Sequence, residues 1–82
     1  MNYTYILWSS RLQKYYTGST NNLDKRVKEH NSGKSKYTKK GIPWRLIKVE
    51  EYLTKKGAYK REMEIKSYKG GIKFKKLIGE VA

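Results

Sequence analysis

Five side chains in this sequence carry groups that can act on a phosphodiester. A guanidinium offers a planar fork that matches phosphate oxygens, and an imidazole titrates near neutral pH. A phenol relays a proton only with help from a neighbouring cation or water, and a carboxylate binds a hard metal ion. The residues that carry these groups are Tyr5, Tyr16, Arg26, His30 and Glu62. If the fold brings the five side chains to one common surface, they predict phosphodiester chemistry.

Each of these residues also has a purely structural interpretation. The tyrosines can serve as strand core and cross-strand pairs. Arg26 can be one more basic residue on a solvated helix face, and His30 a packed, hydrogen-bonded histidine. Glu62 falls on the apolar side of its helix, where it must pair with a lysine, reach solvent or bind a metal. Taken singly, the residues leave both interpretations open.

The first half of the chain predicts the elements that carry four of the five. Residues 2–9 and 14–18 are rich in β-formers, and the short polar link between them predicts an antiparallel hairpin. Gly18 is expected to end the second strand in a backbone conformation closed to other residues. A helix should begin after Asn21 or Asn22, bury Leu23, Val27 and His30, and stop at residues 31–33.

The second half predicts a basic loop at 34–42, an edge strand at 44–53 and a helix at 55–68 that Thr54 caps. After Gly70 and Gly71 comes a short basic helix whose apolar residues suit packing on the sheet. The order β-β-α-β-α-α predicts a single α+β domain over residues 1–82. Its core is a three-stranded antiparallel sheet flanked by helices.

Charge is the strongest compositional signal. Twenty Lys and Arg against seven Asp and Glu leave a net charge of +13 on 82 residues. This excess predicts a polyanionic partner, by default nucleic acid, although solubility alone is the alternative. The chain has no cysteine and one histidine, so a metal would be a hard cation on oxygen ligands, Mg²⁺ or Mn²⁺. No secretory or membrane-spanning stretch is visible, which predicts a soluble, cytoplasmic protein.

The order of the motifs is more specific than any one residue. Tyr3-Thr4-Tyr5 is followed by Tyr16-Thr17-Gly18, then by Arg26 and His30, and the run Ala58-Tyr59-Lys60-Arg61-Glu62 comes later. With this order the chain resembles the GIY-YIG nuclease superfamily, and within it the short single-domain proteins akin to bacterial YhbQ. It departs from the common pattern in Tyr3 and Thr17, which replace Gly and Ile, and in having no clear polar Asn after the glutamate helix.

The resemblance implies a role for each matching residue. Tyr5 and Tyr16 would flank the attacking water, with Tyr16 as proton acceptor or relay, and Arg26 would hold the scissile phosphate. His30 would be an accessory base or phosphate contact, and Glu62 would bind one Mg²⁺ or Mn²⁺. The substrate contacts expected from the basic loop are Lys36, Tyr37, Lys39 and Lys40.

The implied activity is metal-dependent hydrolysis of DNA, on structured or damaged substrates in repair or recombination. Two alternatives remain open at this point. One is a nucleic-acid-binding module that has the same fold with little or no catalysis. The other is a basic structural protein of a ribonucleoprotein, held by charge and stacked tyrosines.

Overall fold

The computed structural model describes residues 1–79, and within them it confirms the α+β fold. Three antiparallel strands form one sheet in the order β2-β1-β3, so the hairpin strand β1 is central and the other two are edges. The elements are β1 (Asn2–Ser9), β2 (Lys14–Thr20), α1 (Leu23–Ser32), the 3₁₀ turn η1 (Lys39–Gly41), β3 (Trp44–Tyr52), α2 (Lys55–Ser67) and α3 (Ile72–Ile78).

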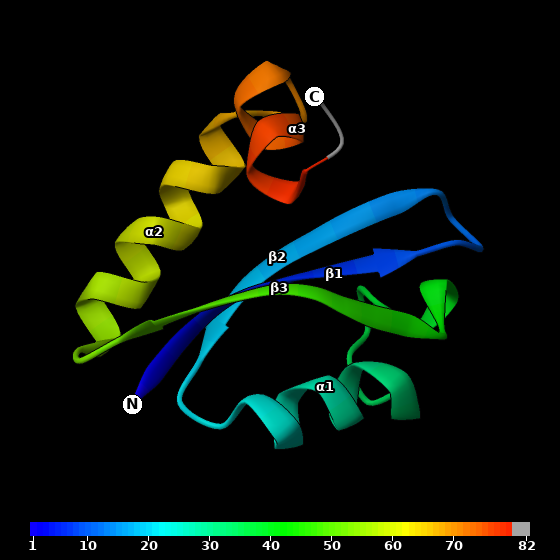
Figure 1. Ribbon diagram of the computed structural model, residues 1–82. Helices are drawn as coiled ribbons and strands as arrows, with labels where there is room; N and C mark the ends of the chain where they lie inside the picture. The colour runs from blue at the N-terminus through cyan, green and yellow to red at the C-terminus, as the bar shows by residue number, and fades with distance from the viewer. Residues whose placement is uncertain (80–82) are drawn as a thin grey trace.

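The sheet lies between two helical layers, with α1 on one face and α2 and α3 on the other (Figure 1). Alternation along β1 gives each face its own core. Tyr5 and Leu7 are buried with Trp44 on the α1 face. Ile6 is buried with Ile65 and Phe74 on the opposite face. The predicted packing of the short last helix on the sheet is therefore confirmed, because Phe74 is its buried anchor.

Helix α1 begins and ends where the sequence predicts. The Asn22 side chain accepts a hydrogen bond from the Lys25 backbone N–H at 3.2 Å, which caps the first turn. Gly33 follows the last turn with φ of 84°, a left-handed conformation that glycine adopts without steric cost. Between these ends, Leu23 and Val27 pack against the first core.

Gly18 does not end its strand, and this expectation was wrong. Strand β2 continues to Thr20, and Gly18 is not among the residues with positive φ in the described part of the chain. The position needs glycine for space: a Cβ there would lie 2.6 Å from the Tyr5 hydroxyl oxygen. The Tyr5 ring, directly opposite in the pairing register, lies over the bare backbone of Gly18.

The other differences are small. The basic loop contains the turn η1. Two hydrogen bonds stabilise this turn, one from the Lys39 N–H to the Ser35 carbonyl and one from the Gly41 N–H to the Thr38 carbonyl. Strand β3 and helix α2 each end one residue earlier than expected. No helix within residues 1–79 is long and apolar enough to cross a membrane.

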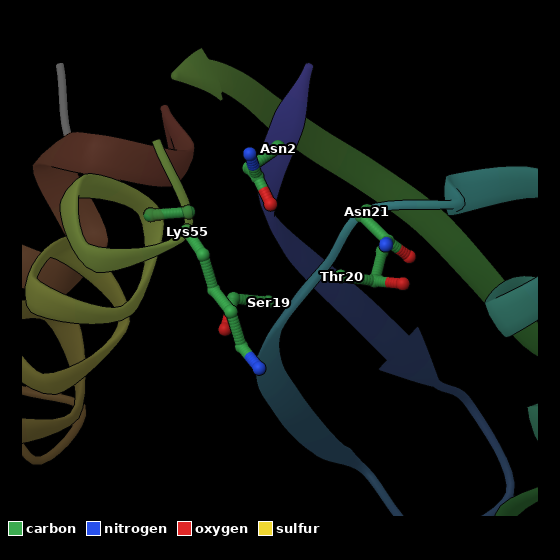
Figure 2. Close-up of a pocket in the computed structure, with 6 residues that line it drawn as sticks. Asn2, Ser19, Thr20, Asn21 and Lys55 are labelled. Carbon is green, nitrogen blue, oxygen red and sulfur yellow. The ribbon is translucent and has the colours of Figure 1, made fainter. Parts of the chain in front are cut away.

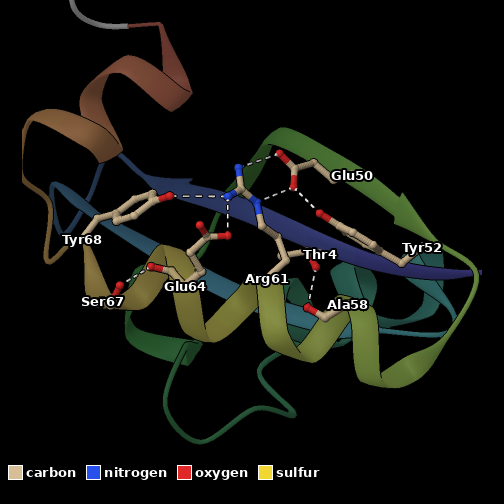
Figure 3. A network of polar contacts seen from close by, with 8 residues as sticks. All are labelled: Thr4, Glu50, Tyr52, Ala58, Arg61, Glu64, Ser67 and Tyr68. Carbon is tan, nitrogen blue, oxygen red and sulfur yellow. Dashed lines mark hydrogen bonds and ion pairs between the residues drawn. The ribbon is translucent and has the colours of Figure 1, made fainter.

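A polar network fastens α2 to the sheet (Figure 3). The Arg61 guanidinium pairs with Glu50 on β3 at 2.8 Å and with Glu64, one turn further along its own helix, at 2.7 Å. The Thr4 hydroxyl donates to the Ala58 carbonyl at 2.7 Å. These contacts fix the rotation of α2 about its axis, and that rotation turns the next residue, Glu62, toward β2.

Candidate active site

The two predicted phenols lie together on the α1 face of the hairpin. Tyr16 and Gly18 are two residues apart on β2, so they share the face onto which Tyr5 projects. The Tyr5 and Tyr16 ring centroids are 6.3 Å apart. Tyr5 is 1 % exposed, whereas Tyr16 is half-buried. Of the two residues, Tyr16 is the more accessible.

His30 reaches this pair from the last turn of α1. Its Nε2 lies 2.9 Å from the Tyr5 hydroxyl and its Nδ1 lies 2.8 Å from the Thr38 hydroxyl. The side chain is completely buried, and burial, followed by the charge of Arg26, lowers the His30 pKa to about 4. At neutral pH the imidazole is therefore neutral, with one nitrogen donating and the other accepting. This burial leaves no surface of His30 open to a phosphate, so the arrangement does not allow the predicted direct contact.

Arg26 is the cation of this cluster. Burial alone would lower its pKa, but the neighbouring Tyr5, Glu29 and Tyr16 side chains hold the pKa above its usual range. The ion pair with Glu29 is long, at 3.4 Å, and the Arg26 side chain is 36 % exposed. A partly exposed guanidinium beside two phenols presents a planar fork of donors, which matches the geometry of phosphate oxygens.

The surroundings keep Tyr5 protonated. Burial and the nearby Tyr16 and Glu62 raise its pKa to about 12, although Arg26 acts in the opposite direction. At neutral pH Tyr5 can donate a hydrogen bond or accept one as a neutral phenol, but it is a poor base.

Glu62 lies on the other side of the edge strand. The carboxylate accepts a hydrogen bond from the Ser19 hydroxyl at 2.7 Å and pairs with the Lys66 ammonium at 2.6 Å. Ser19 follows Gly18 on β2, so alternation places its side chain on the α2 face. The acid and the phenols therefore lie on opposite faces of the sheet at β2, and the expectation that all five groups share one surface was wrong for Glu62. They remain close enough for the Glu62 charge to raise the pKa of Tyr5.

Within residues 1–79, no group of three or more His, Cys, Asp or Glu side chains could hold a metal ion. Glu62 is a single carboxylate that is 8 % exposed. Mg²⁺ commonly binds proteins through one or two carboxylates, keeping waters and substrate phosphates as its other ligands. Glu62 fits such a singly held ion, provided that Lys66 releases the oxygen it now occupies.

The predicted substrate contacts lie in the basic segment between α1 and β3. Tyr37 is 91 % exposed. Its neighbour Thr38 is buried and ties the segment to His30 through the hydroxyl and to Trp44 through the carbonyl. Lys36, Lys39 and Lys40 are exposed around this anchor, and their contact with substrate stays a prediction.

Three residues of the site were not singled out from the sequence: Ser19, Thr38 and Lys66. The i,i+4 spacing of Glu62 and Lys66 on one helix is a recognisable ion-pair signal. The other two had no usable signal, because their roles depend on how α2 and the 34–42 segment fold back onto the hairpin.

Two hairpin phenols and a helical guanidinium lie on one side of the edge strand β2 and a carboxylate lies on the other, in an α+β domain with a three-stranded sheet. The family model for the GIY-YIG catalytic domain matches residues 1–75, and the chain belongs to this family.

The chain is similar to proteins that carry the name UPF0213. A UPF0213 protein of Syntrophus aciditrophicus is 48 % identical over 67 residues, which is 79 % of this chain and 76 % of the relative. One from Haloquadratum walsbyi is 43 % identical over 67 residues, 80 % of this chain and 74 % of the relative. The solution NMR structure of a UPF0213 protein from Bacillus halodurans is 36 % identical and has a TM-score of 0.61. That match covers 99 % of this chain and 86 % of the other.

Proposed function

We propose that the protein is a metal-dependent endonuclease that hydrolyses DNA phosphodiester bonds, on structured or damaged DNA in repair or recombination. The observation that carries this proposal is the cluster of Tyr5, Tyr16 and Arg26 on the α1 face beside β2, with the Glu62 carboxylate on the other side of the same strand. The net charge of +13 supports a polyanionic partner.

In the proposed reaction a water attacks phosphorus as the bond to the leaving sugar oxygen breaks. Tyr16 accepts or relays the water's proton, and the leaving oxygen takes up a proton from solvent. Arg26 binds the phosphate and stabilises the charge that builds up in the transition state. Neutral His30 acts as a positioning residue, because its hydrogen bond fixes the Tyr5 hydroxyl beside Arg26.

Glu62 would hold the divalent ion, Mg²⁺ or Mn²⁺. When bound, such an ion supplies positive charge to the phosphate and to the leaving oxygen. The Ser19 hydroxyl orients the Glu62 carboxylate by donating a hydrogen bond to Oε1, the oxygen that Lys66 does not contact.

The test is cleavage of a panel of linear, nicked, flapped and branched DNA, with Mn²⁺ and with chelator. Glu62→Gln should abolish cleavage. Glu51→Gln is the matched control, since it removes one carboxylate from an exposed position on β3. Metal-independent cutting, or equal rates for the two variants, would show that the assignment is wrong.

A second candidate is a nucleic-acid-binding module without efficient catalysis. It is favoured by the occupation of both Glu62 oxygens, one by Ser19 and one by Lys66. Steeply salt-dependent binding together with no cleavage on any substrate of the panel would select it.

A further inference from the structure

Two hollows follow one another along the line where α2 passes the edge strand β2. The first, of about 260 Å³, lies at the start of α2 (Figure 2). The second, of about 460 Å³, lies toward the other end of the helix. The Glu62–Ser19 hydrogen bond stands on the same line. We call the whole feature the α2–β2 groove; its walls include Ser19, Thr20, Asn21 and Lys55 in the first hollow and Lys14, Tyr16, Thr17, Lys66 and Lys69 in the second.

Lysines mark the length of this groove. Glu62 follows Lys55 by seven residues and precedes Lys66 by four, so the three side chains lie on one side of α2. Lys69 follows the helix, and Lys14 faces the second hollow from β2. Helix α2 has 13 residues, so it spans roughly 20 Å at about 1.5 Å per residue. That length accommodates several consecutive phosphates of one strand, with the carboxylate between the cations.

The second hollow also has an apolar wall. Ile65 and Phe74 are buried there, and the Tyr15 ring lies 5.0 Å from Phe74, centroid to centroid. An apolar wall with a rim of lysines suits a nucleobase together with its phosphate. A base within a duplex is stacked on both faces and paired, so it cannot enter such a hollow. Tyr16 also lines this hollow, from the edge strand that separates the hollow from the Tyr5–Tyr16–Arg26 cluster on the other face of the sheet.

We infer that the α2–β2 groove binds one unpaired DNA strand, with phosphates on its lysines, a base in the second hollow and the scissile phosphate at the level of Glu62. The inference rests on the proposed function and adds the substrate class. A junction or flap qualifies because it offers an unpaired strand beside the cut, whereas a continuous duplex does not.

The test is binding measured by fluorescence anisotropy with chelator present, so that no strand is cut. The probes are a labelled 12-nucleotide single strand and the same sequence as a blunt duplex. The groove variant is Lys14→Gln/Lys55→Gln, which removes one cation from each hollow. Its control is Lys56→Gln/Lys60→Gln, which makes the same charge change at exposed positions of α2 that line neither hollow.

The wild-type protein should bind the single strand on the order of tenfold more tightly than the duplex at equal salt. In the groove variant, the slope of log affinity against log salt should fall by about 1.4, since each lost phosphate contact on a single strand contributes about 0.7. The control should change the slope much less. Equal losses in both variants, or equal affinity for single strand and duplex, would overturn the inference.

This outcome is separable from the proposed function. Metal-dependent cleavage by the wild-type protein, together with unchanged binding in the groove variant, would refute strand binding in the α2–β2 groove but support the proposed nuclease activity. Loss of binding in the groove variant, without any cleavage by the wild-type protein, would support strand binding in the α2–β2 groove but refute the proposed nuclease activity.

Discussion

Substitution of Gly18 by alanine tests the packing that holds Tyr5 in place. The added Cβ would lie 2.6 Å from the Tyr5 hydroxyl oxygen and 2.8 Å from the adjoining ring carbon. Such contacts force a shift, and overpacking of this kind costs about 1–3 kcal/mol. A displaced Tyr5 also loses its hydrogen bond to His30, which is worth about 1 kcal/mol. Alanine in place of glycine returns about 0.5–1 kcal/mol in a strand, so the net loss should be about 2 kcal/mol.

For a domain of this size, that loss corresponds to a fall in Tm of roughly 8–16 °C. Thermal and denaturant unfolding, followed by circular dichroism, measure it. The control is a double-mutant cycle with Tyr5→Leu, a side chain that does not reach the Gly18 backbone. In that background Gly18→Ala should cost much less, because the remaining close contact is with the Tyr16 ring at 3.1 Å. A variant as stable as the wild type, or a penalty that persists without the Tyr5 ring, would refute the steric explanation.

Three further predictions concern charge and hydrogen bonding. Because the folded His30 pKa of about 4 lies below the ordinary 6.5, the unfolded chain takes up the proton first. Denaturant titrations should therefore show full stability above pH 6.5 and a loss of roughly 2–3 kcal/mol in the free energy of unfolding toward pH 4.5. In His30→Gln the free energy of unfolding should depend less on pH over this range. A pH profile of the variant identical to that of the wild type would contradict a buried, neutral His30. Lys66→Met should tighten Mn²⁺ binding several-fold, because the lysine no longer competes for the Glu62 oxygen. Electron paramagnetic resonance measures this affinity, and weaker Mn²⁺ binding in the variant would argue against competition. Arg61→Met should cost about 1–2 kcal/mol, because Glu50 loses its cationic partner. A Tm unchanged from that of the wild type would show that the network does not fasten α2.

Most of the fold was readable from local signals. The hairpin followed from β-forming residues on either side of a short polar link, and α1 followed from Asn22 at its start and Gly33 at its end. Helix α2 was correctly placed by the Thr54 cap, whose hydroxyl accepts from the Gly57 N–H at 3.0 Å. Each of these features depends on residues a few positions apart, and this is the range that sequence patterns report.

The details of the site depend on long-range packing and were harder to foresee. The need for glycine at position 18 comes from the Tyr5 ring on the neighbouring strand. The location of Glu62 across the strand edge depends on which face of the sheet α2 covers. The burial of His30 was predicted from its helix, but its hydrogen bond to Thr38, which lies in the segment between α1 and β3, was not. In each case the deciding partner has no sequence periodicity that connects it to the residue in question.

The most direct measurement compares the cleavage rates of two neighbouring tyrosine variants under single-turnover conditions with Mn²⁺. Tyr16 lies in the cluster with Arg26, whereas Tyr15 packs on the opposite face against Phe74. Tyr16→Phe should slow cleavage by about 10²–10⁴-fold, the usual contribution of a general base or relay, and Tyr15→Phe should retain nearly the full rate. Equal rates for the two variants and the wild-type protein would contradict a nuclease site at the edge of β2.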